Sequence, residues 1–183
     1  VMTFEELLNF SVIIGSDIPA MLVNKPIIVW GRGEKVAQNE SIIFGNTVAK
    51  YCQDISLILV KPLCSSNTNE AFSLLGRAIS NQEIIPSSYF DNDFFEIISS
   101  SKDNFIEYFN NDFQDIVFNQ SVVYREIYDC LTSIGADKVM LSGSGSTCIG
   151  FFSNNNSQSV LKKVKSLVPK GSFCAETRII SRT

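Results

Sequence analysis

The chain has 183 residues, a formal net charge of −4 at pH 7, no histidine and a hydrophobic content of 45%. This length suits one ordinary domain, or one domain with a piece of another, and the apolar content is enough for a buried core. The acidic balance argues against nucleic acid or a membrane as a partner, and without histidine any base chemistry falls to Asp, Glu, Lys or Tyr.

Five cysteines are spread along the chain and are never spaced as Cys-x-x-Cys. They are Cys52, Cys64, Cys130, Cys148 and Cys174. Without histidine partners this set predicts no zinc or other metal site and favours buried, reduced thiols. No apolar run is long enough to span a bilayer, and Glu5 and Glu6 stand where a signal peptide would be basic. We therefore expect a cytoplasmic protein.

The first residues of the chain predict a helix. Thr3 and Glu6 form a capping box ahead of apolar residues, which indicates a helix over Phe4–Ile14. Gly15 should end it in a left-handed conformation, and Pro19 should prevent a new helix from starting. Because this helix has no preceding strand to pack on, we expect that the sequence begins part-way along a longer protein. Its leading segment should expose apolar surface and either self-associate or be disordered.

Short strands are expected next, over residues 21–23, 26–30, 35–36 and 41–44, with a turn over 31–34. A change of composition near residues 46–53 then marks a domain boundary. We assign residues 1–50 to the tail of a leading domain and residues 51–183 to a compact second domain.

The second part of the chain alternates strands and helices. Strands are expected over residues 55–60, 139–141, 148–152 and 173–180, and helices over 69–79, 94–98, 113–134 and 157–168. Thr68 should cap the first of these helices, and Gly135 should end the longest one. The order strand, helices, strand, strand, helix, strand is typical of an α+β fold of the ferredoxin-like kind.

Asp17 is the first candidate for a catalytic group. It stands between flexible Gly15 and rigid Pro19, where a carboxylate could orient or deprotonate a substrate hydroxyl. Glycine, serine, aspartate and proline are also the residues of an ordinary turn. The composition of this segment therefore leaves a catalytic role and a structural role both open.

The second candidate is a segment of small residues between two apolar runs. It consists of Ser142, Gly143, Ser144, Gly145, Ser146 and Thr147. Its glycines would let backbone N–H groups converge on an anion such as a phosphate, and they would equally suit a tight connection between strands. The segment is not a Walker loop, since no Gly-Lys-Ser/Thr follows, and no helix starts directly after it as in a Rossmann fingerprint.

Three further features carry weaker signals. Arg32 in a Gly-Arg-Gly-Glu turn and Arg178 near the last strand could contact a phosphate or simply face water. Cys148, beside the glycine segment, would need an activating base to act as a nucleophile, and no histidine is present. Core packing explains the 14 phenylalanines better than base stacking does in an acidic chain.

Taken in order, these segments resemble the GHMP kinases. The resemblance rests on Gly15-Ser16-Asp17-Ile18-Pro19, Gly31-Arg32-Gly33-Glu34, Val60-Lys61-Pro62, Asn92-Asp93 and Ser142-Gly143-Ser144-Gly145. It extends over essentially the whole chain, but only over the carboxyl-terminal part of the family's length. Within the family, it is closest to the branch that phosphorylates a cytidine-diphosphate sugar alcohol.

The resemblance implies an activity and a site. It implies transfer of the γ-phosphoryl group of ATP, with Mg²⁺, to the 2-hydroxyl of that sugar alcohol in the non-mevalonate route to isoprenoids. Asp17 would be the catalytic aspartate, and residues 142–147 would be the family's third motif. The first two motifs would precede Val1, so we expect this chain alone to be inactive. Another GHMP kinase activity and a non-enzymatic ferredoxin-like ligand-binding module are the alternatives.

Overall fold

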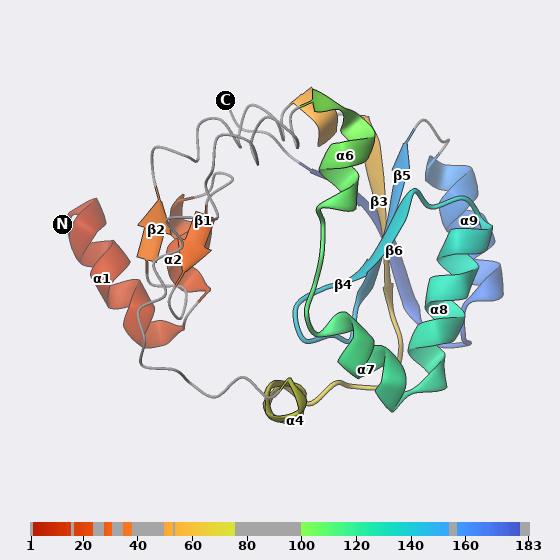
Figure 1. The fold of residues 1–183 in the computed structure, drawn as a ribbon, viewed down its shortest axis with the longest axis horizontal. Helices are drawn as coiled ribbons and strands as arrows, with labels where there is room; N and C mark the ends of the chain where they lie inside the picture. The colour runs from red at the N-terminus through yellow and green to blue at the C-terminus, as the bar shows by residue number, and fades with distance from the viewer. Residues whose placement is uncertain are drawn as a thin grey trace.

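A computed structural model shows a mixed α and β molecule, with a group of small elements beside a larger sheet (Figure 1). The residues that it describes are 2–15, 17–23, 28–30, 35–37, 50–52, 54–75, 100–153 and 157–179.

The larger sheet has four antiparallel strands in the order β4-β5-β3-β6. Its strands are β3 (Ile55–Lys61), β4 (Lys138–Leu141), β5 (Cys148–Ser153) and β6 (Phe173–Arg178). Helix α8 (Val122–Ser133) precedes β4, and helix α9 (Ser157–Leu167) joins β5 to β6. This succession of strands and helices, with this strand order, is the split βαβ topology, which confirms the predicted ferredoxin-like α+β fold.

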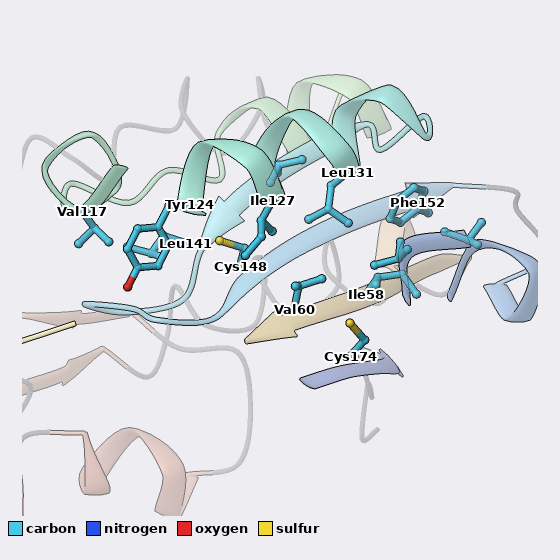
Figure 2. Packing of buried hydrophobic residues seen from close by; sticks show 13 residues of the cluster. Ile58, Val60, Val117, Tyr124, Ile127, Leu131, Leu141, Cys148, Phe152 and Cys174 are labelled. Carbon is cyan, nitrogen blue, oxygen red and sulfur yellow. The ribbon is translucent and has the colours of Figure 1, made fainter. Parts of the chain in front are cut away.

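One face of the sheet packs against α8 and α9 and forms the main core (Figure 2). The buried residues of this core are Ile58, Val60, Val117, Tyr124, Ile127, Leu131, Val139, Leu141, Cys148, Phe152, Val160, Val164 and Cys174. Gly150 lies under this helix layer, where an added Cβ would come within 2.8 Å of the Phe152 ring and 3.1 Å of a Leu131 methyl group. The close approach of α8 to β5 therefore needs a residue without a side chain at this position.

The opposite face of the sheet carries a second, smaller core. It buries Ile55 and Phe151 from the strands against Phe105 and Ile106 of helix α6 (Lys102–Glu107). This short helix was not among the elements expected from the sequence. Because strand β3 is covered on both faces, residues 57–60 are all apolar instead of alternating between apolar and polar residues.

The long helix expected over residues 113–134 is two helices. Helix α7 (Gln114–Gln120) ends at Ser121, which is extended with φ −152° and ψ 132°. The Ser121 hydroxyl accepts a hydrogen bond from the Val123 N–H at 3.3 Å and so caps α8. Serine interrupts the helix because its hydroxyl offers the backbone a local partner outside helical geometry. Gly135 ends α8 with φ 100°, as predicted.

Helix α1 (Phe4–Ile14) has the predicted capping box, with Thr3 accepting from the Glu6 N–H and donating its own N–H to Glu6. The left-handed ending predicted at Gly15 is wrong, because this residue is extended with φ 177°.

The prediction that Pro19 blocks a new helix, and the strand predicted over residues 21–23, are also wrong. Helix α2 (Ile18–Val23) contains Pro19 in its first turn. A proline is tolerated there because the N–H that it lacks would have had no helical partner.

Two short strands follow α2, within or close to the ranges where strands were expected, and they pair antiparallel. They are β1 (Ile28–Trp30) and β2 (Lys35–Ala37), with Val29 opposite Val36. The turn expected over 31–34, the strand expected over 41–44 and the helix expected over 94–98 lie outside the described residues, as does most of the segment 46–53.

Helix α4 (Thr68–Leu74) begins where a helix was expected, but its cap is Asn67 and not Thr68. The Asn67 side chain accepts hydrogen bonds from the N–H groups of Asn69 and Glu70 at 3.1 and 3.4 Å. Asparagine is among the strongest N-cap residues, and its side chain satisfies two of the four free N–H groups at the helix start. The end expected near residue 79 lies outside the described residues.

Candidate functional site: the β4–β5 loop

The glycine segment 142–147 is the tight loop between the antiparallel strands β4 and β5. The Ser142 N–H donates to the Thr147 carbonyl at 2.8 Å, and the Gly145 N–H donates to the Ser142 carbonyl at 2.9 Å. Gly143 and Gly145 have φ angles of 56° and 93°, a region that other residues adopt only with strain. The local sequence therefore determines the loop, because its turn needs glycine at these two positions.

The two glycines face different surroundings. A Cβ added at Gly145 would lie 3.1 Å from the Cβ of Ser66 and 3.4 Å from a methyl group of Leu141. A Cβ added at Gly143 would have no atom within 4 Å. Gly145 thus permits close packing inside the protein, whereas Gly143 leaves an accessible side of the loop for a ligand.

The first residue of helix α4 and the segment before it each contribute one hydroxyl group to this region. Because Asn67 caps α4, the Thr68 hydroxyl is free to bond the Ser144 hydroxyl at 2.8 Å. The Ser66 hydroxyl is buried beside Gly145 and has no hydrogen-bond partner within the described part of the chain. A buried hydroxyl without a partner is costly, so a ligand that accepts its hydrogen bond would be favoured.

The start of helix α7 and the segment before it hold the other side of the loop. The Asn111 side-chain amide donates to the carbonyls of Leu141 and Gly143 at 2.7 and 2.8 Å, and Gln114 accepts from the Leu141 N–H at 2.9 Å. These residues were not singled out from the sequence. Asn111 has the local signal of a capping residue, since it accepts from the Phe113 N–H at 3.0 Å. The loop residues that Asn111 contacts are about 30 positions away along the chain, so no local sequence pattern indicates these contacts.

The polar groups beneath the loop are held in their neutral forms. Burial, with a smaller contribution from the nearby Cys64 thiol, raises the pKa of Cys148 to about 12. Burial and the same thiol also raise the pKa of the Tyr124 hydroxyl. A thiol that stays protonated is a poor nucleophile. This agrees with the expectation that Cys148 is not catalytic, and all five cysteines are free thiols.

Asp17, the other candidate, lies in a different part of the molecule. It is exposed, and its backbone carbonyl accepts a hydrogen bond from the Met21 N–H at 3.2 Å, so it stands at the start of α2. Figure 1 shows α1 and α2 apart from the sheet that carries the loop. The structure thus brings Ser66, Thr68 and Asn111 into contact with the loop. It does not place Asp17 beside them.

The two arginines singled out from the sequence do not join the loop. Arg32 lies outside the described residues. Arg178 is exposed and pairs with Ser56 at one end of β3, whereas the loop-flanking Cys148 pairs with Val60 near the other end.

The described ranges contain no group of three or more Asp, Glu, Cys or His side chains that could hold a metal ion. Within the same ranges, none of the helices has the length and apolar content that crossing a bilayer requires.

The fold and the loop match a known class of protein. Residues 93–170 match the family model described as GHMP kinases C terminal. This match contains β4, the glycine loop and β5, so this part of the chain is similar to the carboxyl-terminal domain of the GHMP kinases.

The curated relatives specify the class further. Proteins named 4-diphosphocytidyl-2-C-methyl-D-erythritol kinase match this chain from Bacteroides fragilis (29% identity, 96% of this chain, 55% of that protein), Clostridium botulinum (30%, 82% and 49%) and Agrobacterium fabrum (26%, 87% and 49%). The chain therefore spans about half the length of the curated relatives that it matches.

A solved structure has the same fold. A crystal structure of 4-(cytidine 5'-diphospho)-2C-methyl-D-erythritol kinase superposes with a TM-score of 0.62 at 14% identity. The superposition covers 93% of this chain and 56% of that one. It therefore extends over both the small elements and the sheet, and again over about half of the longer protein.

Proposed function

We propose that this chain is the carboxyl-terminal portion of an ATP-dependent kinase that phosphorylates the 2-hydroxyl of 4-diphosphocytidyl-2-C-methyl-D-erythritol, in the non-mevalonate route to isoprenoids. The observation that carries the proposal is that relatives with this one name match up to 98% of the chain, including the loop. We further propose that residues 1–50 are the tail of the amino-terminal kinase domain, that residues 51–183 are the second domain, and that the protein is cytoplasmic.

The geometry of the loop fits a phosphate-bearing ligand. Among the described hydrogen bonds, none uses the N–H groups of Ser144 and Ser146, and the Ser66 hydroxyl is an unpaired buried donor nearby. Backbone donors on a glycine loop are a common way to bind phosphate oxygens. Mg²⁺ would need only one or two protein carboxylates, because a nucleotide's phosphates and water supply its other ligands.

The chemistry of phosphoryl transfer assigns simple roles to the residues of this chain. Bound Mg²⁺ would neutralise part of the charge on the phosphates. Asp17 would accept the proton of the substrate hydroxyl as that oxygen attacks, a step for which an ionised carboxylate is suited. The loop would orient an anionic group through its backbone N–H groups, which stabilises charge without titrating.

The test is an ADP-release assay with ATP, Mg²⁺ and 4-diphosphocytidyl-2-C-methyl-D-erythritol. It uses the 183-residue chain alone and the same chain preceded by the amino-terminal portion of the Bacteroides fragilis relative. We expect no turnover from the chain alone and substrate-dependent turnover from the joined protein. Asp17→Asn should lower kcat at least about 100-fold with a small effect on KM, because the general base is lost.

A matched control is Asp54→Asn, which makes the same chemical change at another exposed aspartate, just before β3. It should leave kcat unchanged. Turnover of homoserine or a mevalonate derivative in place of the cytidine-diphosphate substrate would show a different GHMP kinase. Full activity of Asp17→Asn would remove Asp17 from the mechanism.

A further inference from the structure

Strand β4 lies at the edge of the sheet, and its last residue is paired on both sides. On the inner side, Leu141 lies opposite Cys148 of β5. On the outer side, where a further strand would lie, the Asn111 amide donates to the Leu141 carbonyl and Gln114 accepts from the Leu141 N–H, at 2.7 and 2.9 Å. Two carboxamide side chains thus take the place of a neighbouring strand at the point where the glycine loop begins.

We propose that Asn111 is a positioning residue: it fixes the Gly143–Ser144 peptide so that the Ser144 N–H is aimed at an anionic group of the substrate or nucleotide. The inference rests on the proposed function for the identity of that anionic group. The part that concerns how Asn111 fixes the shape of the loop does not depend on the proposed function.

The argument starts from the planarity of the peptide bond. In a trans peptide, the carbonyl of one residue and the N–H of the next lie in one plane and point in opposite directions. Asn111 binds the Gly143 carbonyl at 2.8 Å, so the Ser144 N–H must point away from Asn111. The same rule explains the Leu141–Ser142 peptide, where Asn111 binds the Leu141 carbonyl and the Ser142 N–H points across the loop to Thr147.

The two N–H groups then differ in one respect. The Ser142 N–H is satisfied inside the loop, whereas the Ser144 N–H has no partner among the described hydrogen bonds. Gly143, which precedes it, has φ 56° and nothing within 4 Å of the position of a Cβ. A fixed N–H donor beside an accessible glycine is the arrangement that receives a phosphate or carboxylate oxygen.

Asparagine is the residue that this role requires. Its amide nitrogen has two N–H groups, one for each loop carbonyl, and its oxygen accepts from the Phe113 N–H at 3.0 Å. Aspartate has nearly the same shape but would place a carboxylate oxygen against two carbonyl oxygens. Alanine would remove the contacts without adding repulsion.

The first experiment measures hydrogen exchange by NMR on the 183-residue chain, without any assay of activity. In Asn111→Asp, the Ser142 and Gly145 N–H groups should exchange at least tenfold faster than in the unmodified chain, while N–H groups of the central strand β3 change little. In Asn111→Ala, the exchange rates of the Ser142 and Gly145 N–H groups should lie between those of Asn111→Asp and those of the unmodified chain. The control Asn119→Asp makes the same change at an exposed position, where the side chain only accepts from Arg125, and should alter neither set.

The order of the variants separates positioning from packing. If Asn111 only filled space, the isosteric Asn111→Asp would be milder than Asn111→Ala, and this order would overturn the inference. Equal acceleration of the loop and of β3 would also overturn it, because the effect would then be a global loss of stability.

The second experiment repeats the ADP-release assay with the joined protein. Asn111→Asp should lower kcat at least tenfold, Asn111→Ala less, and Asn119→Asp not at all. If the unmodified protein turns over and Asn111→Asp loosens the loop without changing kcat or KM, the positioning role is wrong. If the unmodified protein has no activity, the proposed function fails, and the exchange experiment still decides whether Asn111 fixes the loop.

Discussion

At the scale of single residues, the β4–β5 loop depends on a few side chains with distinct tasks. Gly145 permits close packing against Ser66, and Gly143 leaves one side of the loop accessible. Asn111 fixes two carbonyls, and Thr68 holds the Ser144 hydroxyl. The glycines are visible in the sequence because the backbone itself needs them, whereas the other contacts come from segments distant along the chain.

The two glycines should respond differently to the same substitution. Gly143→Ala should destabilise the protein by about 1–2 kcal/mol, the cost of a left-handed conformation in a residue with a Cβ. Gly145→Ala should cost more, about 2–4 kcal/mol, because its methyl group also overlaps Ser66. Urea unfolding of the two variants measures the difference. Equal losses would show that the contact with Ser66 relaxes freely.

At the scale of elements, helix starts and ends follow side-chain capping more closely than apolar periodicity. Ser121 divides one apolar pattern into α7 and α8, and Asn67 instead of Thr68 begins α4. The apolar periodicity over residues 113–134 nevertheless indicated the buried face of α8, since Ile127 and Leu131 enter the main core and Val123 and Ile134 pack against it. A capping side chain can thus shift an element's boundary while the face that it buries stays the same.

The capping box of α1 predicts a pH dependence. Hydrogen bonds from the Thr3 backbone and then from its side chain lower the pKa of Glu6 below its usual 4.5. A lowered pKa means that the ionised carboxylate stabilises the helix start. This contribution is fully present above pH 4.5 and is lost as the pH falls through the lowered value.

NMR titration of the Glu6 carboxyl group should therefore show a pKa below 4.5, and Thr3→Ala should bring it closer to that value. Glu6→Gln keeps an oxygen acceptor but does not titrate. In this variant, the backbone chemical shifts at the start of α1 should not change over the same pH window. A parallel change in both proteins would assign the effect to another group.

At the scale of the whole molecule, the sheet has two covered faces, while α1 and α2 carry apolar side chains on their surface. Phe4, Phe10, Ile13, Ile14 and Met21 are all more than half exposed. This is the apolar surface expected for the leading segment. Scattered apolar residues are normal on a protein surface, but several on one helix pair favour association.

We therefore expect the 183-residue chain to self-associate through α1 and α2. The double variant Phe10→Gln with Ile13→Gln should lower the sedimentation coefficient at equal protein concentration. The control is Leu63→Gln. Leu63 is 82% exposed, about as much as Ile13 at 80%, but it follows strand β3 and lies outside α1 and α2. A monomeric unmodified chain, or an equal effect of Leu63→Gln, would contradict this.

The amino-acid sequence by itself determined those features that local backbone chemistry controls. They include the capping box at Thr3, the apolar strand β3, the end of α8 at Gly135 and the glycine loop, each of which depends on neighbours a few positions away. The ferredoxin-like fold class also followed from the succession of strands and helices along the chain, because few topologies bury these elements.

Only the tertiary structure decided which side chains surround the loop. Asn111 and Thr68 contact residues about 30 and 76 positions away, and no local pattern encodes such a pairing. The same holds for α6, whose apolar residues are buried only because the second face of the sheet is present. Contacts of this kind are fixed by the packing of whole elements, and packing is a property of the folded chain rather than of any segment within it.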